Sequence, residues 1–161
     1  GSLRVARIHR QDNVIMSLPD ATVQAVDRLL VDDTPEHLKE FEKILGRVWH
    51  GLKGSQHDPR GPFQVRIADL EHPVTKGIGD FETDDELYTC LAGEEPIHLL
   101  AEATSSVDRR PHPMAFVREH GKGRVFLTTL GHDVKALATP QAAELIRRGT
   151  AWSANLEPAA P

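Results

Sequence analysis

Hydrophobic and polar positions alternate with a period of two in several short stretches of this chain, and that period predicts β-strands. Residues 3–8 and 63–67 show this pattern, and residues 81–91 and 97–103 are further candidates for extended structure. Residues 114–118 and 125–130 are also rich in strand formers, and Gly121 and Gly123 lie between them. Because glycine tolerates the dihedrals of a tight turn, this arrangement predicts a β-hairpin.

Apolar residues recur at helical spacing in three other stretches. The first extends from residue 17 to residue 31, and the second begins at Thr34-Pro35 and ends at Gly46. The third begins at Pro140 and carries its apolar face as far as Trp152. A further helix is expected just after Asp133, since a carboxylate is favourable in the first turn of a helix.

Length and composition favour one α/β domain over residues 1–155, followed by a disordered tail at 156–161. The chain has 161 residues and a net charge of −5 without a basic cluster, which disfavours a nucleic-acid partner. It lacks an apolar run long enough for a membrane span, and a cytoplasmic location without a membrane partner is expected. Cys90 is the single cysteine, so no internal disulfide forms. A lone cysteine is most often a small buried hydrophobe, and we expect that of Cys90.

The clearest candidate chemistry follows the predicted strand 125–130. Gly131 ends this strand and is followed by His132 and Asp133. In open α/β sheets, ligands gather at the carboxyl ends of strands, so these side chains are placed where a site is expected. His132 is the candidate general base, because an imidazole exchanges protons at neutral pH. The alternative is a histidine that only caps the helix.

Several motifs in one order give residues 40–154 a resemblance to the trehalose-utilisation (ThuA-like) family. They are Phe-Glu-Lys-Ile-Leu-Gly (41–46), His-Asp-Pro-Arg-Gly-Pro-Phe (57–63), Glu-His-Pro-Val-Thr-Lys-Gly-Ile (71–78), Asp-Glu-Leu-Tyr (85–88), the stretch 121–133 and Arg-Gly-Thr-Ala-Trp (148–152). The resemblance implies a flavodoxin-like sheet with flanking helices, related to class I glutamine amidotransferases. It also implies carbohydrate metabolism, with trehalose or a related sugar as the ligand.

Residues 1–39 match the family poorly, so the N-terminal half of the family sheet is expected to be missing or replaced. A half sheet leaves an unpaired edge, and we therefore expect a homodimer. In the amidotransferase relatives, a histidine and a carboxylate after a late strand activate a cysteine nucleophile. His132 and Asp133 resemble that pair, but Cys90 lacks the glycine-rich turn of the nucleophile. Glutamine hydrolysis is therefore not expected.

The resemblance extends to the Asp-Glu-Leu-Tyr motif and completes a set of candidate site residues. The candidates for catalysis are His132, Asp85 and Glu86, and those for binding a sugar are Tyr88, His57 and Asp133. If the site is assembled, His132 lies within one hydrogen bond or one bridging water of a carboxylate at 85 or 86. No organic cofactor is indicated, and a divalent metal held by His57 and His132 stays open. So does the alternative of a non-catalytic binding or assembly module.

Overall fold

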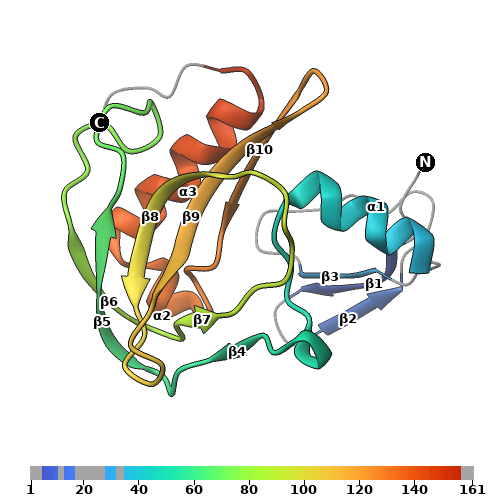
Figure 1. The fold of residues 1–161 in the computed structure, drawn as a ribbon, viewed down its shortest axis with the longest axis horizontal. Helices are drawn as coiled ribbons and strands as arrows, with labels where there is room; N and C mark the ends of the chain where they lie inside the picture. The colour runs from blue at the N-terminus through green and yellow to red at the C-terminus, as the bar shows by residue number, and fades with distance from the viewer. Residues whose placement is uncertain (1–4, 11–12, 17–27, 32–34, 157–161) are drawn as a thin grey trace. The chain divides into compact units, whose positions relative to one another are not determined.

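The computed structural model describes residues 5–10, 13–16, 28–31 and 35–156 (Figure 1). The chain divides into two compact units, residues 1–42 and residues 43–161, which are described separately below. The prediction of one domain over residues 1–155 stays a prediction. The predicted disordered tail lies outside the described residues, except for Leu156.

The first unit contains a three-stranded antiparallel sheet with the order β2-β1-β3. Its strands are β1 (Val5–Arg10), β2 (Asn13–Met16) and β3 (Arg28–Val31). β1 confirms the strand predicted near residues 3–8. The helix predicted over residues 17–31 is wrong at its end, where residues 28–31 pair with β1, and residues 17–27 lie outside the described part. The apolar run at 29–31 suits a strand as well as a helix, and pairing with β1 decides between them.

The second unit is built on a curled five-stranded sheet with the order β10-β9-β8-β5-β6. Its strands are β5 (Gly61–Ile67), β6 (Phe81–Asp85), β8 (His98–Thr104), β9 (Pro111–His120) and β10 (Gly123–Thr128). β9 and β10 form the predicted hairpin, and Gly121 at the turn has a φ of 60°. A separate short ladder joins β4 (Gln56–His57) to β7 (Tyr88–Thr89), just after the short 3-10 helix η1 (Gly51–Lys53).

The described residues form three α-helices. The helix α1 (Pro35–Leu45) begins and ends where the sequence predicts, and Gly46 after it has a φ of 86°. The helices α2 (Val134–Leu137) and α3 (Pro140–Ser153) also confirm their predicted starts. All pairings between the described strands are antiparallel. The helices and the sheets together give an α/β architecture. That the sheet has a flavodoxin-like form stays a prediction.

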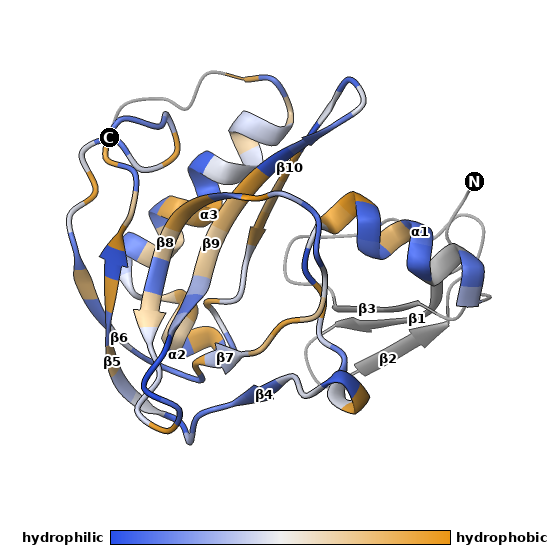
Figure 2. Cartoon of the chain, viewed as in Figure 1, coloured by the Kyte–Doolittle hydropathy of each residue, from blue (hydrophilic) through white to orange (hydrophobic). Residues whose placement is uncertain are grey.

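The core of the second unit lies between the sheet and α3, which runs beside β10 (Figure 1). Its fully buried side chains include Val65, Leu100, Met114, Ala142 and Leu145. β4 and the tip of the β9–β10 hairpin are hydrophilic, as Figure 2 shows. α3 approaches the sheet closely at Gly149, where an added Cβ would lie 2.3 Å from the Phe126 ring. The absence of a side chain there lets the helix pack against β10.

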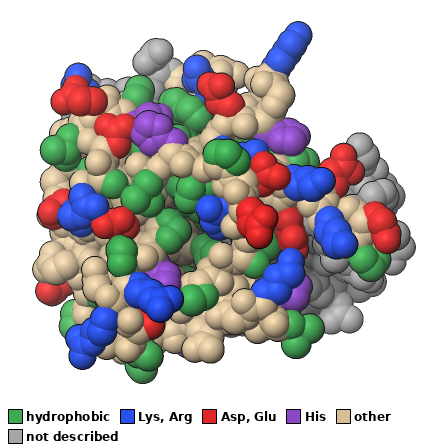
Figure 3. Space-filling model, viewed as in Figure 1, with side chains coloured by type: hydrophobic (Ala, Val, Ile, Leu, Met, Phe, Trp, Pro, Cys, Tyr) green, Lys and Arg blue, Asp and Glu red, His purple; other side chains and the backbone are tan. Residues whose placement is uncertain are grey.

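The surface carries charges of both signs. Figure 3 shows acidic and basic side chains interspersed on the face that it draws. Within the described residues, no helix combines the length and the apolar character that crossing a membrane requires.

Candidate functional site

The three consecutive acidic residues that follow Thr83 point to two different faces, because side chains alternate along a strand. Along β6 the odd-numbered residues point inward, and the same alternation continues to Thr89. The Asp85 side chain is therefore buried at 1% exposure, whereas Glu86 and Tyr88 lie on the other, partly exposed face. Asp84 points outward with them and lies 2.5 Å from Lys135 Nζ. The neighbouring carboxylates of Asp85 and Glu86 thus face different surroundings.

Asp85 holds the segment that carries His132. Its Oδ2 accepts a hydrogen bond from the Gly131 backbone N–H at 2.6 Å, and its Oδ1 accepts one from the His132 N–H at 3.1 Å. Oδ1 also accepts the N–H of Glu86 at 2.8 Å. Three backbone donors therefore satisfy this buried carboxylate. The bonds tie the end of β6 to the loop after β10.

Glu86 and His132 form the centre of the candidate site. His132 Nδ1 lies 3.0 Å from Glu86 Oε2, which is hydrogen-bond distance. The Tyr88 hydroxyl donates to the same Oε2 at 3.1 Å and lies 3.3 Å from His132 Nδ1. His132 and Glu86 are 39% and 17% exposed at their side chains. The site is therefore partly covered and still open to a ligand.

The β4–β7 ladder brings His57 to the same place. His57 and Tyr88 are directly paired across the two strands, and their rings lie 5.8 Å apart. His57 Nδ1 lies 3.9 Å from Glu86 Oε2 and 2.9 Å from the Asp58 carbonyl oxygen. The carbonyl can only accept, so Nδ1 carries the proton of that bond. Both predicted histidines thus flank one carboxylate.

Trp49 completes this group, although sequence reasoning missed it. Its ring meets Tyr88 edge-on at 5.4 Å between centroids and lies 6.2 Å from the His57 ring. The side chain is 50% exposed, which is unusual for so large an apolar residue. A loop tryptophan carries no periodic signal, and only the β4–β7 pairing reveals its neighbours. We call Trp49, His57, Glu86, Tyr88 and His132 the Glu86 cluster.

Asp133 lies beside the cluster with a different set of contacts. Its Oδ1 accepts the Ala136 N–H at 2.9 Å, so Asp133 is the N-cap of α2. Its carboxylate also pairs with the Arg60 guanidinium. The Ala136 bond and the Arg60 partner together lower the pKa of Asp133 below its ordinary value. These contacts support a structural role, and its role in binding a sugar stays a prediction.

Asp58, which follows His57 in the chain, is a buried carboxylate. Ser105 Oγ donates to its Oδ1 at 2.8 Å, and the backbone and side chain of Ser106 donate to Oδ2 at 2.7 and 3.0 Å. Burial alone would raise the pKa of Asp58, and these hydrogen bonds reverse the effect and lower it. Asp58 therefore anchors the end of β4 to the loop at residues 105–110.

The expectation that Cys90 is buried is wrong, and the structure places Cys90 in a group of possible metal ligands. Cys90 is exposed rather than buried, and it follows β7 at a left-handed turn with a φ of 53°. Among the described residues, Cys90, Asp108 and His112 bring three metal-ligating atoms within 4.8 Å of one another. His57 and His132 are not part of that group, and a metal held by them stays a prediction.

One family model and one solved structure are similar to this chain. The family model named ThuA and described as trehalose utilisation matches residues 33–153. The fold is similar to that of a solved protein titled ThuA-like from Parabacteroides merdae, with a TM-score of 0.60 and 23% sequence identity. That match covers 74% of this chain and 52% of the solved chain, so this chain spans about half the length of that protein. A search of curated proteins gave no match.

Proposed function

The chain belongs to the trehalose utilisation (ThuA) family, and on that premise we propose that the Glu86 cluster binds a sugar and transfers a proton on it. The observation that carries the proposal is the 3.0 Å contact between His132 Nδ1 and Glu86 Oε2. A carboxylate at one ring nitrogen fixes the tautomer and leaves the other nitrogen to a ligand. The sugar is trehalose, a related sugar or a keto derivative of one.

His132 is the proton carrier in this proposal. Its Nδ1–H donates to Glu86, so the lone pair of the neutral ring lies on Nε2. A C–H or O–H of the bound sugar gives its proton to Nε2, and the imidazolium that forms is stabilised by the carboxylate of Glu86. The proton returns to the sugar when the step is complete. Asp85 supports this chemistry by positioning, because both of its oxygens accept backbone N–H groups.

The remaining members of the cluster suit a sugar ligand. Trp49 and Tyr88 present aromatic surface, which packs against the C–H face of a sugar ring. The Tyr88 hydroxyl, the Glu86 carboxylate and His57 supply hydrogen-bonding groups for sugar hydroxyls. The aromatic rings would fix the plane of the sugar, and the polar groups would select its orientation.

A flavodoxin-like relationship to glutamine amidotransferases and a homodimeric assembly belong to the same proposal. The five-stranded sheet has β6 and β10 at its two edges, and an edge strand offers unpaired backbone groups to a second chain. Sedimentation at micromolar concentration would show a dimer if such pairing occurs. A monomer throughout that range would remove this part of the proposal and leave the Glu86 cluster unaffected.

Exchange of sugar hydrogens with solvent tests the proton transfer. A panel of trehalose, related disaccharides and keto sugars is incubated with the protein in D2O, and loss of a C–H signal is followed by NMR. A base that removes a proton next to a carbonyl returns a deuteron, so exchange needs no oxidant. We expect exchange on a keto sugar with the wild-type chain. His132→Asn should abolish it, and Glu86→Gln should slow it by about 10²-fold or more.

Matched variants separate binding from chemistry. His120→Asn changes an exposed histidine at the end of β9 and should leave exchange unchanged. Trp49→Ala should weaken sugar binding, measured by calorimetry, while His132→Asn retains it. Binding without exchange in the wild-type chain would reduce the cluster to a binding site. Absence of binding across the panel, or full exchange with His132→Asn, would overturn the proposal.

A further inference from the structure

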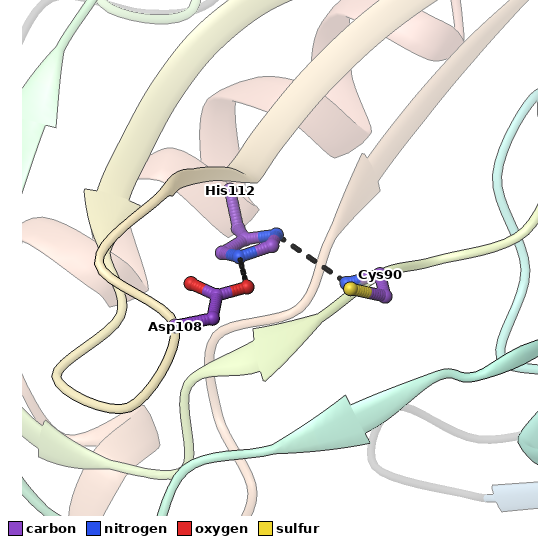
Figure 4. Close-up of side chains that lie close together, drawn as sticks. All are labelled: Cys90, Asp108 and His112. Atoms are coloured by element: carbon purple, nitrogen blue, oxygen red, sulfur yellow. Dashed lines mark hydrogen bonds and ion pairs between the residues drawn. The ribbon is translucent and has the colours of Figure 1, made fainter.

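We propose that Cys90, His112 and Asp108 form a site for a thiophilic divalent cation such as Zn²⁺, separate from the Glu86 cluster. The three side chains come from different parts of the second unit and converge, as Figure 4 shows. Cys90 follows β7, Asp108 lies in the loop between β8 and β9, and His112 is at the start of β9. One donor atom from each lies within 4.8 Å of the others.

The donor set selects the class of metal. A thiolate sulfur, an imidazole nitrogen and a carboxylate oxygen are all ligands of Zn²⁺, and the sulfur disfavours Mg²⁺ and Ca²⁺. Three protein ligands leave a fourth tetrahedral position to water or to a small ligand. Cys90 and Asp108 are exposed, so an ion can enter from solvent. When the metal binds, the thiol gives its proton to solvent, and the ring proton of His112 leaves as well if Nε2 is the ligand.

The ligands are held in position before a metal arrives. His112 is buried at 8% exposure, and its Nε2 lies 2.9 Å from Asp108 Oδ2. Its Nδ1 accepts the Cys90 backbone N–H at 3.3 Å, so both ring nitrogens have a partner in the metal-free chain, and a metal takes the place of one of these two contacts. On the other side of the cysteine, Ser55 Oγ donates to the Cys90 carbonyl at 2.9 Å. Bonds on both sides therefore fix Cys90 at its φ of 53°, a conformation that a non-glycine residue rarely adopts.

The loop that carries Asp108 is equally well fixed. Ser105 Oγ accepts the N–H groups of Val107 and Asp108 at 3.0 and 3.1 Å. Ser105 in turn donates to the buried Asp58 carboxylate. A donor set on a fixed backbone loses little conformational freedom when a metal binds. A bound ion would link the end of β7 to the β8–β9 loop and to β9, and it would stabilise the second unit.

Cobalt provides a test that is specific to the cysteine. Co²⁺ replaces Zn²⁺ in tetrahedral sites, and a thiolate ligand gives a charge-transfer absorption that nitrogen and oxygen ligands do not give. Cys90 is the single cysteine, so this absorption reports on it alone. We expect the absorption to appear on titration of the full chain with Co²⁺ and to disappear when Zn²⁺ is added. Cys90→Ser should abolish it.

Two further variants and one stability measurement complete the test. Asp108→Asn should weaken Co²⁺ binding about 10-fold or more. His98→Gln is the control. It removes a histidine that lies 2.7 Å from Asp69, in a pair that includes no thiol, and it should leave Co²⁺ binding unchanged. Zn²⁺ should raise the melting temperature of the wild-type chain and not that of Cys90→Ser. Wild-type chain alkylated at Cys90 provides the same comparison if the serine variant folds poorly.

A wild-type chain without thiolate absorption at saturating Co²⁺ would overturn the proposal. An equal Zn²⁺-induced shift in melting temperature with and without the thiol would do the same, because the ion would then bind elsewhere. Neither result would bear on the sugar-exchange experiment, because that experiment reports on the Glu86 cluster alone.

Discussion

Asp85→Asn tests whether the buried carboxylate holds the backbone that carries His132. The asparagine oxygen can still accept the N–H groups of Glu86 and His132, as Asp85 Oδ1 does now. Its amide NH₂ then faces the Gly131 N–H, which now donates to Oδ2 at 2.6 Å. Two donors cannot bond to each other, so a partly buried N–H loses its acceptor. Such a loss costs about 1–3 kcal/mol.

Urea unfolding followed by circular dichroism measures this cost, and thermal melting gives a second reading. A loss of about 2 kcal/mol corresponds to a fall of about 4–8 °C in melting temperature for a chain of this length. Asp84→Asn is the matched control, since it makes the same change one residue earlier on the exposed face, where Asp84 pairs with Lys135. The control should lose much less stability, because exposed ion pairs contribute little. Equal losses in the two variants would refute the assignment of Asp85 as a buried anchor.

Substitutions at Gly149 and Glu144 give two further predictions, the first about packing and the second about charge. Gly149→Ala would gain about 1 kcal/mol in helix propensity, but the new Cβ would lie 2.3 Å from the Phe126 ring, and overpacking costs about 1–3 kcal/mol or more. We expect a net loss of stability in urea unfolding and partial recovery when Phe126→Leu is added; a stabilised single variant would contradict the close contact. Glu144 has a pKa lowered to about 2 by its bonds to Arg147 and Arg148. A lowered pKa stabilises the fold above the unfolded value near 4.5, so the stability advantage over Glu144→Gln should be full above pH 4.5 and decline towards pH 2. An advantage independent of pH over that range would show that the carboxylate charge is not responsible.

Periodicity predicted much of the second unit because its strands have one buried face. Residues 63–67 and the β9–β10 hairpin show that pattern clearly, and the structure confirms both. The same reasoning failed at residues 28–31, where three consecutive apolar residues fit either period. Only the partner strand β1 settles that choice, and a single sequence does not reveal strand pairing.

The motif resemblance predicts that, in an assembled site, His132 lies within one hydrogen bond or one bridging water of a carboxylate at 85 or 86, and it leaves the choice between the two open. A signal for that choice was present in the sequence. Phe81 and Leu87 are apolar and occupy odd positions, so a continuous strand phase predicts that Asp85 points inward. The sequence held no such signal for Trp49, because residues in a loop show no hydrophobic periodicity. The pairing of Cys90 with His112 depends on tertiary contacts across 22 residues.

Two adjacent carboxylates thus have different surroundings because side chains alternate along a strand. Asp85 is buried and fixes the backbone of residues 131–132, and that backbone places the His132 ring against Glu86. Glu86 is partly exposed, so replacing it with glutamine should change the chemistry of the cluster with little effect on stability. Replacing Asp85 should change both, because in the proposed function it acts on the ligand only through His132. We therefore expect the ratio of activity loss to stability loss to be much higher for Glu86→Gln than for Asp85→Asn. That difference is the signature of a positioning residue beside a proposed catalytic one.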